Sequence, residues 1–234
     1  MTLTLIGTGV AFDLTLAGIE ALKKCDEAYI ETYTNLIEEE KITALEKQIK
    51  KKITRLERSH VESAYLVDKA KTLAVCILAS GDPLTATTHI TLVIEARQKG
   101  IPVAVIHNSS IYAVAPARSG LQAYRFGKTT SLVNPRPNYA PTSSLDAVRE
   151  NLSRNLHTLV LLDTEPQPMD AKAALEMLSE FESAVVLSRA GHTDEKITHG
   201  KISELKKKYL GKPPFTVIVP AKLHPMEEEY LAQY

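Results

Sequence analysis

The protein has 234 residues, of which 44% are hydrophobic and 24% charged, and its 28 Lys plus Arg balance its 28 Asp plus Glu. These proportions are typical of globular domains and disfavour disordered and collagen-like chains. The balanced charge removes the electrostatic excess on which general nucleic-acid binding relies, so no direct nucleic-acid partner is predicted. Apolar stretches such as 73–79 are far shorter than the roughly 20 residues that span a membrane, so no membrane association is predicted. Because the chain starts without a secretory pattern, we expect it in the cytoplasm.

Cysteine and histidine usage gives no sign of a metal or a disulfide framework. Cys25 and Cys76 lie in unrelated segments, and both are expected to be reduced core residues. The histidines are spread over separate segments without the short spacing of metal ligands, so no metal site is predicted. No G-x-S-x-G string occurs, which leaves a serine nucleophile unsupported.

The first half of the chain alternates short β-rich runs with longer helical patterns, an order typical of a doubly wound open sheet. Ser59 and Glu62 have the spacing of a capping box and predict a helix that continues to Lys71. The run LAVCIL at 73–78 is apolar throughout, as expected for a central parallel strand covered on both faces. The expected strands are 2–6, 28–31, 73–78 and 101–106, and the expected helices lie near 16–22, 38–51, 59–71 and 85–99.

A stretch rich in small residues, 110–120, separates the two halves. Pro116 within it indicates a short helix and a bend, which places the domain boundary there and gives domains 1–112 and 113–234. The predicted fold class is therefore α/β, with two α/β domains. In the second domain the expected strands are 129–133, 158–162, 184–187 and 215–219, and the expected helices lie near 144–155, 169–180 and 202–209.

Three unusual loops follow predicted strands, at the end of an open α/β sheet where ligands bind. They are 7–9, 80–83 and 107–110. Gly7 and Gly9 form G-x-G without a third glycine, which fits a tight turn as well as a ligand loop. Asp82 either caps the following helix or accepts hydrogen bonds from a ligand. Thr85, Thr87 and Thr88 fit cap and helix-face positions as well as they fit ligand contacts.

Longer strings along nearly the whole chain are more specific than these glycines. They are LTLIGTG at 3–9, IETYT at 30–34, SGDPLTATTH at 80–89, VIHNSSIY at 105–112, GLQAYRFGKT at 120–129, APTSSLDAVRENLSRNLHTLVLLD at 140–163, LSRAG at 187–191 and PPFTVIVPAKLH at 213–224. Together they resemble the diphthine synthase family, within the tetrapyrrole-methylase-like class of S-adenosylmethionine-dependent methyltransferases. The segment VAFDLT after Gly9 is shorter than the acidic loop usual in that family.

The resemblance implies a homodimer of two-domain subunits that bind S-adenosylmethionine in a cleft between the domains. It implies a protein substrate, the modified histidine of translation elongation factor 2. The amino group of its aminocarboxypropyl arm is methylated successively on the way to diphthamide. Archaeal members stop at the trimethylammonium product, whereas eukaryotic members also form a methyl ester.

The same resemblance implies a set of cofactor contacts drawn from several loops. Carried over position by position, they are Val10, Asp82, Thr85, Ser110, Ile111, Leu162, Ala190 and His224. Methyl transfer is an in-line displacement for which orientation supplies much of the rate, so no dedicated nucleophile is required. The acceptor amine must still lose its proton before it attacks. Asp163 and Glu165 are candidates for that base by position only, and a structural role fits each of them as well.

Two other functions fit the same fold. One is a methyltransferase that acts on a porphyrinoid or on RNA, because fold alone does not fix the substrate. The strings GLQAYRFGK and PTSSLDAV argue against it. The other is an inactive dimer that only binds a nucleoside.

Overall fold

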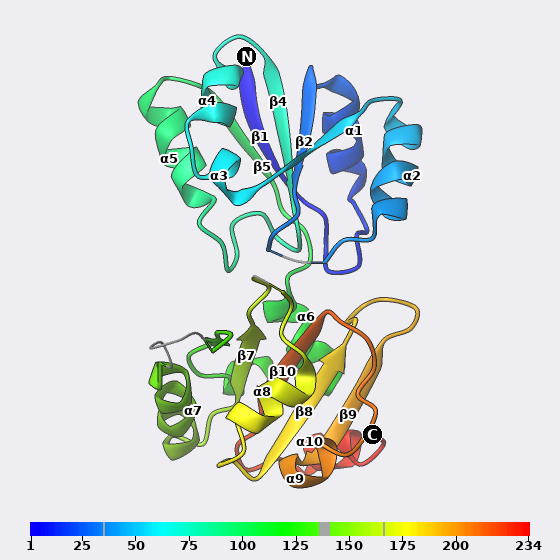
Figure 1. The fold of residues 1–234 in the computed structure, drawn as a ribbon, viewed down its shortest axis with the longest axis vertical. Helices are drawn as coiled ribbons and strands as arrows, with labels where there is room; N and C mark the ends of the chain where they lie inside the picture. The colour runs from blue at the N-terminus through cyan, green and yellow to red at the C-terminus, as the bar shows by residue number, and fades with distance from the viewer. Residues whose placement is uncertain (35, 136–140, 166) are drawn as a thin grey trace. The chain divides into compact units, whose positions relative to one another are not determined.

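The computed structural model describes residues 1–34, 36–135, 141–165 and 167–234. The chain divides into two compact units, residues 1–110 and 111–234, and each unit builds its own five-stranded sheet (Figure 1). The expected boundary after residue 112 falls in the first turn of α6 (Ile111–Ser119). Ala140, which opens the matched stretch 140–163, lies outside the described residues. Within the described ranges, no helix has both the length and the apolar character needed to cross a membrane.

The first unit contains a fully parallel sheet in the order β3-β2-β4-β1-β5. Its strands are β1 (Thr2–Gly7), β2 (Glu27–Glu31), β3 (Ile53–Leu56), β4 (Ala74–Ala79) and β5 (Val103–Ile106). The apolar run predicted as a central parallel strand is β4, which lies in the middle of the order. Because the strands are parallel, the loops that follow them emerge at one edge of the sheet.

Helices cover both faces of this sheet, which explains why β4 is apolar at every position. Val75 and Ile77 pack on the face covered by α4 (Tyr65–Ala70) and α5 (Ile90–Gln98). Cys76 and Leu78 pack on the opposite face, under α1 (Leu16–Lys24) and α2 (Glu39–Ile49). Both cysteines are free and buried, as predicted.

The second unit contains a mixed sheet in the order β6-β7-β10-β8-β9, in which β6 and β7 pair in parallel and the other three described pairs are antiparallel. Alternate residues of its strands face two apolar clusters. One lies under α7 (Ser143–Ser153), α8 (Ala171–Met177) and α9 (Ile202–Leu205), and the other under α6 and α10 (Pro225–Leu231). The strands are β6 (Thr130–Leu132), β7 (Thr158–Leu162), β8 (Ser183–Ser188), β9 (Lys196–Lys201) and β10 (Phe215–Val219).

Three local predictions in the first unit were wrong. The helix expected from Thr85 begins only at Ile90, because Ala86 takes a left-handed backbone with φ of 57° that ends any regular turn before it. Ser59 caps nothing, since it lies inside α3 (Arg58–Val61), which is separate from α4. The helix near 16–22 is expected because Leu16, Ile19 and Leu22 share one apolar face, but Leu16 is 84% exposed at the first position of α1.

Four elements were not predicted at all. The strands β3 and β9 are short or rich in polar residues, so neither shows the apolar run that marks a buried strand. The other two are the 3-10 turn η1 (Ala123–Arg125) and the helix α10. Both carry residues of a buried polar network in the second unit.

Candidate functional site

The glycines after β1 and β4 lock two loops of the first unit together. The amide of Gly9 donates to the carbonyl of Gly81, and the reverse bond has the same length, 3.1 Å. Both residues have positive φ, 71° and 67°, a conformation that favours glycine. A Cβ on Gly7 would lie 2.5 Å from the Gly81 carbonyl oxygen. The tight-turn interpretation of Gly7 and Gly9 is therefore confirmed.

The loop after β5 is tied to the loop after β1. Asn108 Nδ2 donates to the carbonyls of Gly7 at 3.1 Å and Asp13 at 3.0 Å. Ser109 Oγ accepts the amide of Val10 at 3.3 Å. These bonds bring Val10, a predicted cofactor contact, beside the loop that contains Ser110, another predicted contact.

Asp82 lies nearly buried in the turn after β4, with 8% of its surface exposed. Its Oδ1 accepts the Leu84 amide at 3.0 Å and the Thr85 hydroxyl at 3.1 Å, and its Oδ2 lies 2.7 Å from His107 Nδ1. Burial alone raises the pKa of Asp82, but hydrogen bonds from Leu84, His107 and Thr85 outweigh it and hold the pKa below its usual value. The carboxylate is therefore ionised, and it organises the turn rather than capping α5.

A buried glutamate anchors the same turn to the end of β2. Glu31 is fully buried, and its carboxylate accepts the amides of Thr34 at 3.0 Å and Ser80 at 3.3 Å. His89, at the far end of the turn, donates from Nδ1 to the Pro83 carbonyl at 3.2 Å. Burial lowers the pKa of His89, against the opposing charge of Glu31. Hydrogen bonds thus join the strings IETYT and SGDPLTATTH in the folded protein.

The first unit therefore brings four predicted contacts to one edge of its sheet. The arrangement offers close backbone approach at glycines, an ionised carboxylate and a neighbouring hydroxyl. A buried carboxylate repels phosphate and accepts hydrogen bonds from amines and hydroxyls. The residues brought together are Val10, Asp82, Thr85 and Ser110.

The other predicted contacts lie at the end of one strand, in one turn and at two helix starts of the second unit. Leu162 is the last residue of β7, and its side chain packs against the cluster under α7, α8 and α9. Ile111 opens α6, and Ala190 is buried in the turn between β8 and β9. Both pack in one apolar cluster with Leu161 and Leu223, the chain neighbours of Leu162 and His224. His224 itself is exposed and caps α10, accepting the Met226 amide at 3.4 Å.

Asp163, one of the two positional candidates for a base, is engaged in holding its own loop. Its Oδ2 accepts the amide of Asn134 at 3.0 Å and its Oδ1 that of Glu165 at 3.2 Å. Asn134 in turn donates to the carbonyl of Glu165 at 3.1 Å. The geometry favours a structural role for Asp163.

A buried polar network holds the segment that leads to His224. Glu227 is fully buried and accepts the amides of His224 at 2.7 Å and Gln122 at 3.0 Å. Its carboxylate also pairs with Arg125 and with His157 Nε2 at 3.2 Å. We call Arg125, His157 and Glu227 the clamp.

The clamp fixes the backbone from Ala221 to His224 at three points. His157 Nδ1 accepts the Ala221 amide at 3.0 Å, and Arg125 Nη2 donates to the Lys222 carbonyl at 2.7 Å. The third point is the His224 amide on Glu227. Burial lowers the pKa of His157, so its ring is neutral and both nitrogens have defined roles. Sequence reasoning missed the clamp, although GLQAYRFGK and PAKLH were recognised as strings.

Asn151 explains the glycine in GLQAYRFGK. Its side chain accepts the Lys128 amide at 3.0 Å and donates to the Lys128 carbonyl at 2.8 Å and the Thr158 hydroxyl at 2.9 Å. A Cβ on Gly127 would lie 2.1 Å from Asn151 Oδ1. The string therefore packs against α7 and β7 through a contact that only glycine allows. No three His, Cys, Asp or Glu side chains converge as metal ligands in the part of the chain that the structure describes.

Comparison with known proteins gives one consistent result. The model of the tetrapyrrole (corrin/porphyrin) methylases matches residues 2–206. The diphthine synthase of Methanocaldococcus jannaschii is 41% identical, over 94% of this chain and 92% of that one. The diphthine synthase of Methanococcus vannielii is 40% identical, over 98% and 97%.

Solved structures agree with the sequence comparison. A crystal structure of diphthine synthase superposes with a TM-score of 0.92 at 34% identity, covering all of this chain and 96% of the other. Both the family model and the relatives extend over both units. The chain therefore belongs to the diphthine synthase family of tetrapyrrole-methylase-like enzymes, which transfer methyl groups from S-adenosylmethionine.

Proposed function

We propose that this enzyme successively methylates the amino group of the aminocarboxypropyl-modified histidine of translation elongation factor 2, in diphthamide biosynthesis. The observation that carries the proposal is the identity of 40–41% to diphthine synthases over at least 94% of the chain. The enzyme acts as a homodimer in the cytoplasm and methylates a protein, without direct contact to nucleic acid.

We further propose the residues that hold the cofactor. They are Val10, Asp82, Thr85, Ser110, Ile111, Leu162, Ala190 and His224. The chemistry of Asp82 and Thr85 supports this assignment, because the amino and ribose hydroxyl groups of S-adenosylmethionine are donors that a carboxylate and a hydroxyl accept. The close approach of the glycine loops suits a ligand that is held partly by backbone groups.

These groups suggest which role each part of the site has in the reaction. S-adenosylmethionine, when bound, supplies an electrophilic methyl group. Asp82 and Thr85 would orient it through hydrogen bonds, and backbone groups of the loops after β1 and β5 would hold it. Holding the acceptor nitrogen in line with the methyl carbon converts a bimolecular step into an effectively unimolecular one. The acceptor nitrogen must be unprotonated when it attacks.

Calorimetry and methylation assays test this proposal. Titration of the purified protein with S-adenosylmethionine is expected to show saturable binding, and elongation factor 2 carrying the aminocarboxypropyl arm is expected to gain methyl groups. Methylation of a porphyrinoid or of RNA, with the modified elongation factor left untouched, would overturn the substrate assignment. The absence of detectable cofactor binding to the folded protein would leave an inactive relative instead.

A further inference from the structure

His107 is not one of the proposed cofactor contacts, but its hydrogen-bond partner Asp82 is. It follows β5 directly, and its Nδ1 lies 2.7 Å from Asp82 Oδ2. The side chain of His107 is 68% exposed, whereas that of Asp82 is only 10% exposed. A nearly buried carboxylate thus holds a largely exposed imidazole at the candidate site.

The contacts of Asp82 fix which nitrogen of His107 carries the proton. The carboxylate is ionised, so it accepts, and Nδ1 of His107 must donate. Rotation of the carboxylate is prevented because Oδ1 already accepts the Leu84 amide and the Thr85 hydroxyl. In the neutral ring Nε2 therefore presents a lone pair. A carboxylate that orients a histidine in this way is the arrangement that general bases use.

We propose that His107 is the general base of methyl transfer and that Asp82 orients it; this inference rests on the proposed function. Nε2 of His107 takes the proton of the acceptor ammonium. The freed nitrogen lone pair forms the new N–C bond as the methyl carbon's bond to sulfur breaks, and the bonding electron pair stays on sulfur. The imidazolium then releases its proton to solvent, so each methyl group transferred yields one proton.

The other titratable groups at these strand ends have different partners. His89 is buried, with Nδ1 on the Pro83 carbonyl and Nε2 3.5 Å from the Tyr33 hydroxyl. Glu31 is fully buried and accepts backbone amides. The carboxylate of Asp13 packs against Gly9. Among the described residues, Asp82 is the charged group in contact with His107.

The tautomer of His107 can be measured without cofactor or substrate. Two-bond ¹H–¹⁵N correlation spectra of the ligand-free protein are expected to show His107 protonated at Nδ1 and unprotonated at Nε2 at a pH where the ring is neutral. Asp82→Asn is expected to abolish this preference. A ring protonated at Nε2 in the wild type would overturn the proposal.

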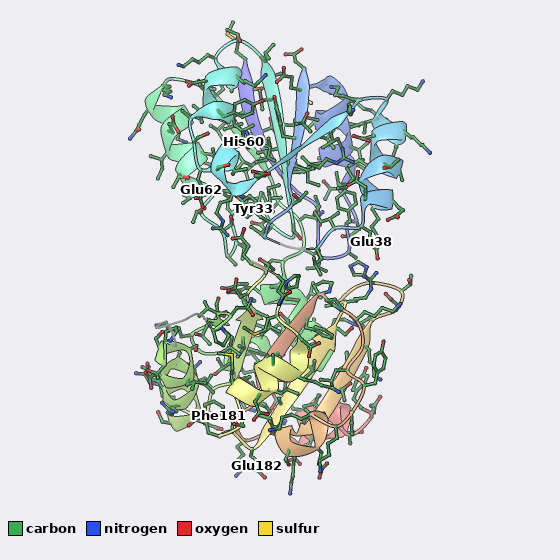
Figure 2. All side chains as sticks on the ribbon, in the orientation of Figure 1. Tyr33, Glu38, His60, Glu62, Phe181 and Glu182 are labelled. Carbon is green, nitrogen blue, oxygen red and sulfur yellow. The ribbon has the colours of Figure 1, made fainter. Side chains whose placement is uncertain are left out.

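The catalytic test uses His107→Asn, because the Asn amide preserves a donor to Asp82 while it removes Nε2. We expect kcat to fall about 10²- to 10⁴-fold, the usual contribution of general-base catalysis, with binding of S-adenosylmethionine by calorimetry nearly unchanged. The acidic limb of the pH–rate profile is expected to disappear in this variant. His60→Asn is the matched control, since His60 is also exposed but lies on α3 (Figure 2), and wild-type activity is expected.

The outcomes separate this inference from the function on which it rests. If the wild type itself transfers no methyl group to the amine, the proposed function fails and the inference fails with it. If the wild type is active and His107→Asn retains its rate and its pH profile, only the role of His107 is overturned. A variant that loses cofactor binding in parallel with activity would also overturn it, because that result shows a binding role.

Discussion

Replacing Glu227 with Gln is expected to destabilise the second unit severely while changing the shape of the side chain very little. Each carboxylate oxygen accepts two hydrogen bonds. Oε1 takes the Gln122 amide and His157 Nε2, and Oε2 takes the His224 amide and Arg125. An amide side chain has only one accepting oxygen, so its NH₂ group must face one of these two pairs of donors.

The magnitude follows from the donors that lose their acceptor. His157 cannot remove its unsatisfied Nε2–H donor by changing tautomer, because its Nδ1 already accepts the Ala221 amide. Each buried donor left unsatisfied costs about 1–3 kcal/mol, which gives about 2–6 kcal/mol for two. Removing one partner of a buried ion pair costs about 3–5 kcal/mol by a separate estimate. Both lines of reasoning place the loss for Glu227→Gln near 3–5 kcal/mol.

Urea unfolding followed by circular dichroism measures this loss directly. Glu228→Gln is the matched control, because the neighbouring Glu228 is exposed and its replacement is expected to change the unfolding free energy by at most about 0.5 kcal/mol. The double variant Arg125→Met with Glu227→Leu is expected to lose less than the sum of its single changes, since no buried charge is then left unpaired. A loss below about 1 kcal/mol in Glu227→Gln would refute the reasoning about the clamp.

Three further predictions follow from contacts in the two units. Gly7→Ala is expected to lose several kcal/mol of stability, because its Cβ would lie 2.5 Å from the Gly81 carbonyl oxygen. Gly100→Ala is the control: its Cβ would have no atom within 4 Å, so it should lose only about 1–2 kcal/mol for its positive φ. Equal losses of stability in thermal unfolding would contradict this prediction. Asp82→Ala is expected to weaken binding of S-adenosylmethionine in calorimetry, and an unchanged affinity would remove Asp82 from the proposed cofactor contacts. Burial lowers the pKa of His157, so as the pH falls the unfolded chain binds a proton on this histidine before the folded chain does. The unfolding free energy should therefore fall as the pH drops below about 6.5, and it should fall less steeply in His157→Gln. Urea titrations that give the same pH dependence for both proteins would rule this out.

The regular parts of the fold were predictable because their signals are local. The strand β4 is apolar at every position, and the structure places it at the centre of a parallel sheet covered on both faces. Pro116 and the small residues around it predicted a short helix, which is α6. The loops after β1, β4 and β5 were predicted to follow strands at the ligand-binding end of the sheet, and hydrogen bonds join them there.

The predictions that were wrong or missing concern features that depend on contacts between residues far apart in the sequence. The segment after Asp82 has helical periodicity, yet a carboxylate that accepts the Leu84 amide and the left-handed backbone of Ala86 keep it in a turn. The pairing of Asp82 with His107 joins residues 25 positions apart, and that of Arg125 with Glu227 joins residues 102 apart. No spacing rule in a single sequence indicates such pairs. The burial of Glu227, which indicates the clamp, becomes visible only once α10 is placed in the fold.

Mass spectrometry of the modified histidine tests the central claim most directly. Elongation factor 2 carrying the aminocarboxypropyl arm is incubated with the enzyme and S-adenosylmethionine, and the modified peptide is then fragmented. The account predicts stepwise addition of methyl groups at the amino nitrogen of that arm, ending at the trimethylammonium product. An unmodified arm after incubation with enzyme that binds the cofactor, or methyl groups found only elsewhere on the protein, would contradict it.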